Sequence, residues 1–185
     1  FGGALAYKVA VGTDGAVTTA TDDPKLGTFF LYEALQAYFL NGGGPCYIIS
    51  VGHFSGESAK TAVALTDFAD AAMTKGVYEL EKLDEPALVL APEAVQLKAS
   101  DYGELSKKIL GICAVMKDRF ALLDTPNDTN VLDFNSDGGL QSFRGTLGTN
   151  DLSYGAVYYP SLNTVMRYQI SEESTFGTDK FSKLK

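Results

Sequence analysis

The chain of 185 residues contains no tryptophan, one histidine and two cysteines. Two cysteines far apart in the sequence, Cys46 and Cys113, exclude a disulfide-rich scaffold. With a single histidine, nitrogen and sulfur ligands are too few for a typical zinc site. We predict that both cysteines are small buried apolar residues. No apolar run reaches the length of about 18 residues that a membrane-spanning helix needs, so none is expected.

The chain has few basic residues: it contains 15 Lys and Arg and 23 Asp and Glu, which gives a formal net charge of −8. Binding to phosphates or anionic lipids requires clustered Lys and Arg, so we expect no direct contact with nucleic acid or membrane. The length suits one domain with a small appendage. We predict a core domain over residues 1–160, followed by a weakly ordered tail or part of a truncated second domain over residues 161–185.

The usual motifs of nucleotide binding and hydrolysis are missing. The stretch 52–58 lacks the lysine of a phosphate-binding loop, and Gly42–Gly44 precedes a predicted strand instead of joining a strand to a helix. No G-x-S-x-G motif of a nucleophilic serine occurs. These absences predict no catalytic, cofactor-binding or metal-binding residues, and hence no cofactor and no enzyme activity.

Apolar periodicity predicts short strands alternating with helices. Asp14-Gly15 lies between two alternating segments and indicates an N-terminal β-hairpin. Asn41–Pro45 ends the first predicted helix, and the β-branched run after it predicts a buried strand. The predicted strands are 46–51, 87–90, 120–123 and 154–159, and the predicted helices are 29–40, 59–73 with a last piece at 77–83, 105–116 with Asp101 as its N-cap, and 140–146.

This alternation is typical of an α/β fold. We predict a mostly parallel sheet with a mixed edge, helices on both faces and the hairpin at the N-terminus.

One set of residues is compatible with catalysis. His53, Glu93 and Asp124 each follow a predicted strand, and the carboxyl ends of parallel strands share one edge of a sheet. A base, an orienting carboxylate and a second acid would meet there. The competing interpretation is that the two acids cap or solubilise loops and that His53 is an exposed loop residue. We favour the second interpretation, because fold alone does not imply function.

Other polar and aromatic groups have structural explanations too. The acidic pairs Asp22-Asp23 and Asp84-Glu85 are compatible with a divalent cation, but such pairs are more often solvated turns. Tyr and Phe total 21, and neighbours such as Tyr158 and Tyr159 point to opposite faces of a strand. Most of these aromatics are expected in the core, and a few are candidates for anchors at a subunit contact.

Four segments resemble the core domain of contractile tail sheath proteins, which occur in phages and related injection machines. They are FFLYEALQAYFLNGGGPCYIISVG at 29–52, LDEPALVLAPEA at 83–94, RFALLDTP at 119–126 and YGAVYYP at 154–160. Each segment alone is weakly specific, whereas four in this order are much more so. Sheath proteins often carry Trp after the last segment, where this chain has Ser161.

The resemblance implies a structural, self-assembling subunit of a sheath that surrounds an inner tube and contracts to drive the tube through a target envelope. Its partners would be copies of itself and the inner tail tube protein. It would be assembled in the bacterial cytoplasm and located in the virion tail or a phage-like particle. The N- and C-terminal arms of the family have no match here, so we expect a central, largely monomeric fragment.

The sequence leaves the type of sheath open between phage tail, bacteriocin-like particle and secretion machine. Two other functions also stay open. One is a hydrolase-like or nucleotide-binding α/β enzyme with its site at the strand ends, and the other is an isolated binding module.

Overall fold

The computed structural model describes residues 7–11, 17–22, 29–52, 62–126, 139–160, 164, 175–176 and 179–180. Its contacts divide the chain into two units. The first contains Phe1–Asn41, Phe54–Ala62 and Thr164–Lys185, and the second contains Gly42–His53 and Val63–Asn163. The units are described separately below, and the boundary expected near residue 160 stays a prediction.

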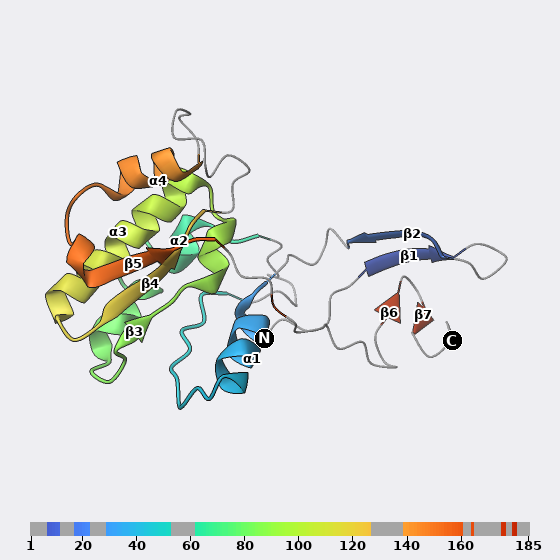
Figure 1. Ribbon diagram of the computed structural model, residues 1–185, viewed down its shortest axis with the longest axis horizontal. Coiled ribbons are helices and arrows are strands. Elements are labelled where there is room, and N and C mark those ends of the chain that lie inside the picture. Colours follow the sequence, from blue (N-terminus) through green and yellow to red (C-terminus); the bar gives the residue numbers. More distant parts are fainter. Residues whose placement is uncertain are drawn as a thin grey trace. The chain divides into compact units, whose positions relative to one another are not determined.

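In the first unit, β1 (Tyr7–Val11) pairs antiparallel with β2 (Val17–Asp22), and β6 (Thr175–Phe176) pairs antiparallel with β7 (Asp179–Lys180) (Figure 1). The turn expected between β1 and β2 lies outside the described residues, so the hairpin stays a prediction. Most of the expected tail, residues 161–185, also lies outside them.

Helix α1 (Leu31–Leu40) forms where the aromatic periodicity predicts a helix. It ends at Asn41, whose backbone N–H and side-chain Nδ2 both donate to the carbonyl oxygen of Ala37, at 3.1 and 2.8 Å. Gly42 follows with φ of +84°, a left-handed conformation that glycine adopts without steric cost. The predicted stop signal is therefore confirmed.

The second unit contains a sheet of three parallel strands in the order β3 (Leu88–Val89), β4 (Phe120–Asp124) and β5 (Gly155–Tyr158). Their register places Leu88 beside Phe120 and Leu122 beside Ala156. The predicted mixed α/β class with a parallel sheet is confirmed at this level.

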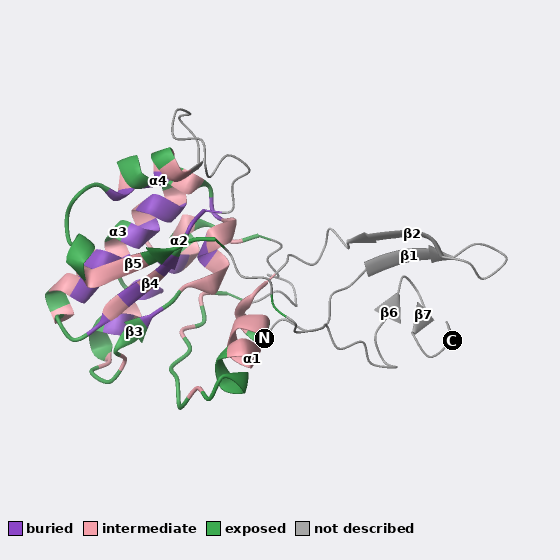
Figure 2. Cartoon of the chain, in the orientation of Figure 1, coloured by how far each residue is buried: buried purple, intermediate pink, exposed green. Residues whose placement is uncertain are grey.

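Helix α3 (Ala99–Met116) packs against β4 and holds the centre of the core (Figure 2). α4 (Gly139–Leu147) packs on α3, where the rings of Tyr102 and Phe143 stack with centroids 5.3 Å apart. The predicted apolar stripe of α3 is confirmed. Its fully or nearly fully buried members are Leu105, Ile109, Ile112 and Cys113.

The N-cap prediction for α3 is wrong. Lys98 occupies the N-cap position, and Asp101 lies inside the first turn. Asp101 still fits there, because the partial positive charge of a helix N-terminus favours an acidic side chain in the first turn.

The prediction of a buried strand at 46–51 is also wrong. These residues belong to no strand, and Cys46 is exposed instead of buried, whereas Cys113 is buried as predicted. Only Ile49 and Val51 pack against the core. The hydroxyl of Ser50 donates to the carbonyl oxygen of Gly52 at 3.2 Å, and such local bonds compete with sheet pairing.

The long helix expected over 59–73 is reduced, in the described residues from 62 onward, to the single turn α2 (Leu65–Phe68). Ala69 is extended and bridges to Gly76, and Asp70 Oδ1 accepts the backbone N–H groups of Thr74 and Lys75 at 2.8 and 3.0 Å. These turn bonds replace helix bonds. The 3₁₀ helices η1 (Val77–Lys82), η2 (Pro92–Gln96) and η3 (Leu152–Tyr154) complete the unit.

The sheet has a covered face and an open face. Val89, Ala121 and Leu123 lie on the covered face and are buried, whereas Val157 of β5, on the same face, is 40% exposed. A Cβ added at Gly155 on β5 would meet Leu110 of α3, so this face lies against α3. On the open face the edge residues Leu88 and Tyr158 are exposed by 57% and 60%, whereas Phe120 and Leu122 of the central strand are partly buried. Helices on both faces of the sheet therefore stay a prediction.

Candidate functional site

The carboxyl edge of the sheet is where the sequence predicts possible chemistry. Asp124 is the last residue of β4, and Glu93 lies in η2, shortly after β3. Because β3 and β4 are parallel neighbours, both acids follow strands that end at the same edge. Glu93 Oε2 accepts a hydrogen bond from Gln96 Nε2 at 3.1 Å, inside its own helix. His53 lies outside the described residues, so a convergence of the three residues stays a prediction.

Asp124 is held through its backbone, not through its carboxylate. Its N–H donates to the hydroxyl oxygen of Tyr102 at 2.9 Å, which links β4 to α3. Burial raises the pKa of Tyr102 to about 12, so the hydroxyl stays protonated near neutral pH. Partial desolvation also raises the pKa of the Asp124 carboxyl, although the residue is exposed as a whole. The hydrogen bond between Asp124 and Tyr102 therefore links β4 to α3, and it leaves the carboxylate of Asp124 uninvolved.

Arg119 is a buried charged residue whose role the sequence did not reveal. It is 3% exposed, and its Nη1 and Nη2 donate to the carbonyl oxygens of Leu80 and Leu83, each at 2.7 Å. Its Nε donates to Asp118 Oδ1 at 2.7 Å, and this contact lowers the pKa of the Asp118 carboxyl. Arg119 therefore ties the end of η1 to the start of β4. An arginine directly after an aspartate at a strand start was the only signal in the sequence.

The acidic pairs do not assemble a cation site in the part of the chain that the structure describes. Asp22 ends β2, and Asp23 lies outside the described residues. In the second pair, Glu85 Oε2 accepts a hydrogen bond from the hydroxyl of Tyr47, which raises the pKa of Tyr47. Among the described residues, no group of three or more His, Cys, Asp or Glu is placed to hold a metal ion.

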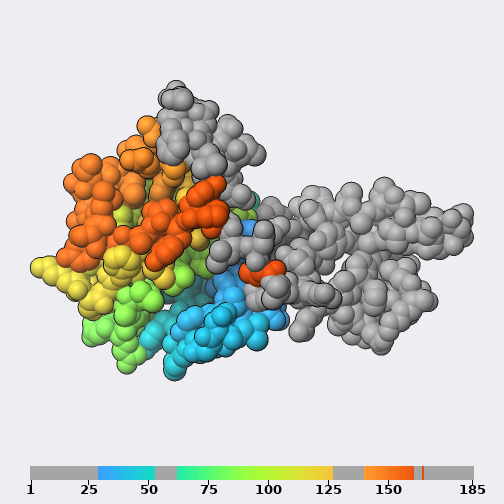
Figure 3. Space-filling model, viewed as in Figure 1, coloured from blue at the N-terminus to red at the C-terminus, as the bar shows by residue number. Residues whose placement is uncertain are grey.

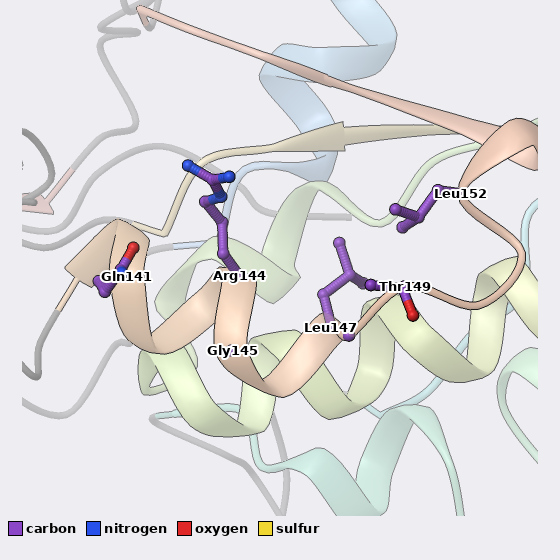
Figure 4. Close-up of a pocket in the computed structure, with 7 residues that line it drawn as sticks. Gln141, Arg144, Gly145, Leu147, Thr149 and Leu152 are labelled. Carbon is purple, nitrogen blue, oxygen red and sulfur yellow. The ribbon is translucent and has the colours of Figure 1, made fainter.

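A surface hollow lies between α4 and η3 (Figure 4). Leu147 and Leu152 point toward each other and form its apolar part, while the guanidinium of Arg144 extends away from α4. Gln141 and Thr149 add polar groups at the margin. A hollow with one cation and two leucines has no nucleophile or acid–base pair, so it offers contact and no evident chemistry.

The most distinctive surface feature is exposed apolar area on the two edge strands and the residues that follow them. Figure 3 shows the segment that contains β5, in orange, open on the viewed face. Large apolar side chains there are unusually exposed, at 57% for Leu88, 59% for Leu90, 40% for Val157, 60% for Tyr158 and 52% for Tyr159. Clusters of exposed apolar side chains of this kind typically mark interaction sites.

Comparison of the chain with protein-family models and with curated proteins found no match. Across the described ranges of the chain, no helix combines the length and the apolar character needed to cross a membrane.

Proposed function

We propose that this chain is a structural, self-assembling subunit of a contractile tail sheath, in which copies surround an inner tube and contract to drive it through a target envelope. Three of the four sheath-like segments, 83–94, 119–126 and 154–160, contain the three neighbouring strands of one parallel sheet. Segments that resemble one family and also pair with one another are mutually consistent support for a shared core.

The observation that carries the proposal is the exposed apolar surface on and beside β3 and β5. A parallel sheet is usually covered on both faces, because its strands are apolar throughout. Leu88, Leu90 and Tyr158 instead remain more than half exposed. Tyrosine and leucine side chains in this position suit a contact with another copy of the chain, since aromatic residues are enriched at protein interfaces.

Under this proposal the partners are copies of the chain and an inner tail tube protein, and the location is a virion tail or phage-like particle. The net charge of −8 disfavours direct contact with nucleic acid. Mechanical work would come from relaxation of an extended lattice to a contracted one, without turnover of a substrate.

The test is electron microscopy of the full-length gene product with and without Tyr158→Asp, because the arms that the resemblance implies lie outside these 185 residues. We expect tubular lattices from the unaltered full-length protein and dispersed particles from the variant, because a buried unpaired carboxylate at an interface is costly. Val115→Asp is the matched control, because Val115 is 74% exposed on α3, outside the sheet. Dispersed particles from the unaltered protein, or equal loss of lattices in both variants, would contradict the proposal.

A hydrolase-like or nucleotide-binding enzyme is the second candidate, and one observation favours it. The Asp124 carboxyl lies at the carboxyl edge of the sheet and has a raised pKa, as general acids often do. This candidate predicts a hydrolytic or nucleotide-dependent activity that His53→Ala and Asp124→Ala both abolish. A measured activity that is unchanged in both variants would exclude this site.

A further inference from the structure

The segment 46–52, here named the strap, has the sequence of a strand without the pairing of one. CYIISVG combines an aromatic with β-branched residues, which favour strands. From Ile48 to Gly52 its residues alternate between exposed and partly buried, and the two partly buried ones, Ile49 and Val51, pack against the core. Alternation with period two is what a strand with one packed face shows.

β3 offers an edge that suits the strap. Among the described residues, β3 pairs with β4 alone, and the N–H of Phe120 donates to Ala87 on that side. The opposite edge of β3 carries backbone N–H and C=O groups without a strand partner in the described chain. Free edges of this kind are templates for a further strand.

One side-chain contact indicates which residues would meet. The Tyr47 hydroxyl donates to Glu85, 38 residues later and three residues before β3. A parallel strand in this register places Val51 beside Val89, and both side chains face the core. It also places Ser50 beside Leu88, and both are exposed. An antiparallel strand from the same contact would run toward Lys82, away from β3.

Two features oppose pairing of the strap with β3. The Ser50 hydroxyl donates to the Gly52 carbonyl at 3.2 Å, which occupies a backbone acceptor that a sheet would use. Pro86, which would lie beside Ile48, has no N–H to donate. Both obstacles are small. A local side-chain bond of this type is weak, and proline is tolerated at the first residue of a strand.

We infer that the strap is a closable fourth strand, which pairs in parallel with the free edge of β3 so that Ser50 lies beside Leu88. The strap also belongs to the segment in which the chain enters the second unit, at Gly42, and leaves it, after His53. Closing the strap extends the parallel sheet of the second unit from three strands to four.

Engineered disulfides test the register. In a Cys46→Ser background, which removes the exposed native thiol and keeps buried Cys113, one variant carries Ser50→Cys with Leu88→Cys. The matched control carries Ser50→Cys with Leu90→Cys, where both positions are again exposed. In the closed state the first pair of Cα atoms is about 4.8 Å apart and the second about 8 Å, which is beyond the reach of a disulfide.

We expect the first pair to form an intrachain disulfide at least about tenfold faster than the control under mild oxidation, measured by thiol counting and mass spectrometry. Equal rates, or a faster control, would overturn the inference. Hydrogen exchange on the unaltered chain gives a second readout that does not depend on the variants folding. Alternate amides between Tyr47 and Val51 should be protected, and exchange of all of them at the rate of an unstructured peptide would also overturn it.

Discussion

The two faces of the β3–β4–β5 sheet are built from alternate residues of the same strands, but they differ sharply in burial. In β3 the neighbours Leu88 and Val89 are 57% and 6% exposed. β4 supplies Ala121 and Leu123 to the covered face, where both are almost fully buried. The difference follows from α3, which packs against one side of β4. On the other face Phe120 and Leu122 of β4 are partly buried, and the edge residues Leu88 and Tyr158 stay largely exposed.

The open face is informative because its composition is not that of a solvated surface. Antiparallel sheets that face water alternate apolar with polar residues, whereas this sheet keeps leucine and tyrosine on its open side, with one acid, Asp124, beside Tyr158. Leu88 and Tyr158 therefore contribute little to the buried core. Their exposure fits a contact with another molecule or another part of the assembly.

Truncating one leucine on each face tests the comparison most directly. Leu123→Ala on the covered face should lower the free energy of unfolding by about 3 kcal/mol, because it leaves a cavity beside α3. Leu88→Ala on the open face should change it by less than about 0.5 kcal/mol, because the side chain is already largely in water. Urea denaturation of both variants measures the difference. Equal losses would show that the open face is packed in solution.

Alkaline pH tests the point where α3 holds the end of β4. Tyr102 has a pKa of about 12 in the folded chain, against about 10 for an ordinary tyrosine. Above pH 10 the unfolded chain releases this proton and the folded chain keeps it, so stability falls as pH rises toward 12. The slope should approach about 1.4 kcal/mol per pH unit.

Tyr102→Phe should remove that part of the pH dependence. It should also cost about 1 kcal/mol at neutral pH, because the N–H of Asp124 loses its acceptor. The measurement is urea unfolding of both proteins at several pH values between 8 and 11.5, and the difference between them isolates Tyr102. An identical alkaline slope in the two proteins would refute the assignment.

The local pattern of apolar residues predicted those elements that bury most of their own side chains. The run 120–123 and the stripe of α3 were predicted correctly, because each buries most of its side chains wherever it packs. The strap has an equally strand-like sequence but depends on β3, 38 residues away from it in sequence, which local pattern cannot evaluate. The helix expected over 59–73 was wrong because Asp70 bonds to two backbone N–H groups of a turn.

The candidate site was predictable only in part. Asp124 was found because a carboxylate after a buried strand marks the carboxyl edge of a parallel sheet. Arg119 was missed, because an arginine is rarely buried and its carbonyl partners at Leu80 and Leu83 have no sequence signature. Cys46 was misassigned for the same reason as the strap, since its burial was predicted from a strand that is unpaired in the structure.

A further comparison concerns the fit between β5 and α3 on the covered face. A Cβ at Gly155 would lie 2.5 Å from Leu110 Cδ2 and 3.1 Å from the carbonyl oxygen of Ala121. Leu110 can shift but the backbone of β4 cannot do so easily, so Gly155→Ala should cost about 1 to 2 kcal/mol in urea unfolding. Gly111→Ala is the control, because no atom lies within 4 Å of its added Cβ on α3. There the alanine should stabilise the helix by about 0.5 kcal/mol, and a Gly155→Ala protein as stable as that control would mean that β5 is not seated against α3 in solution.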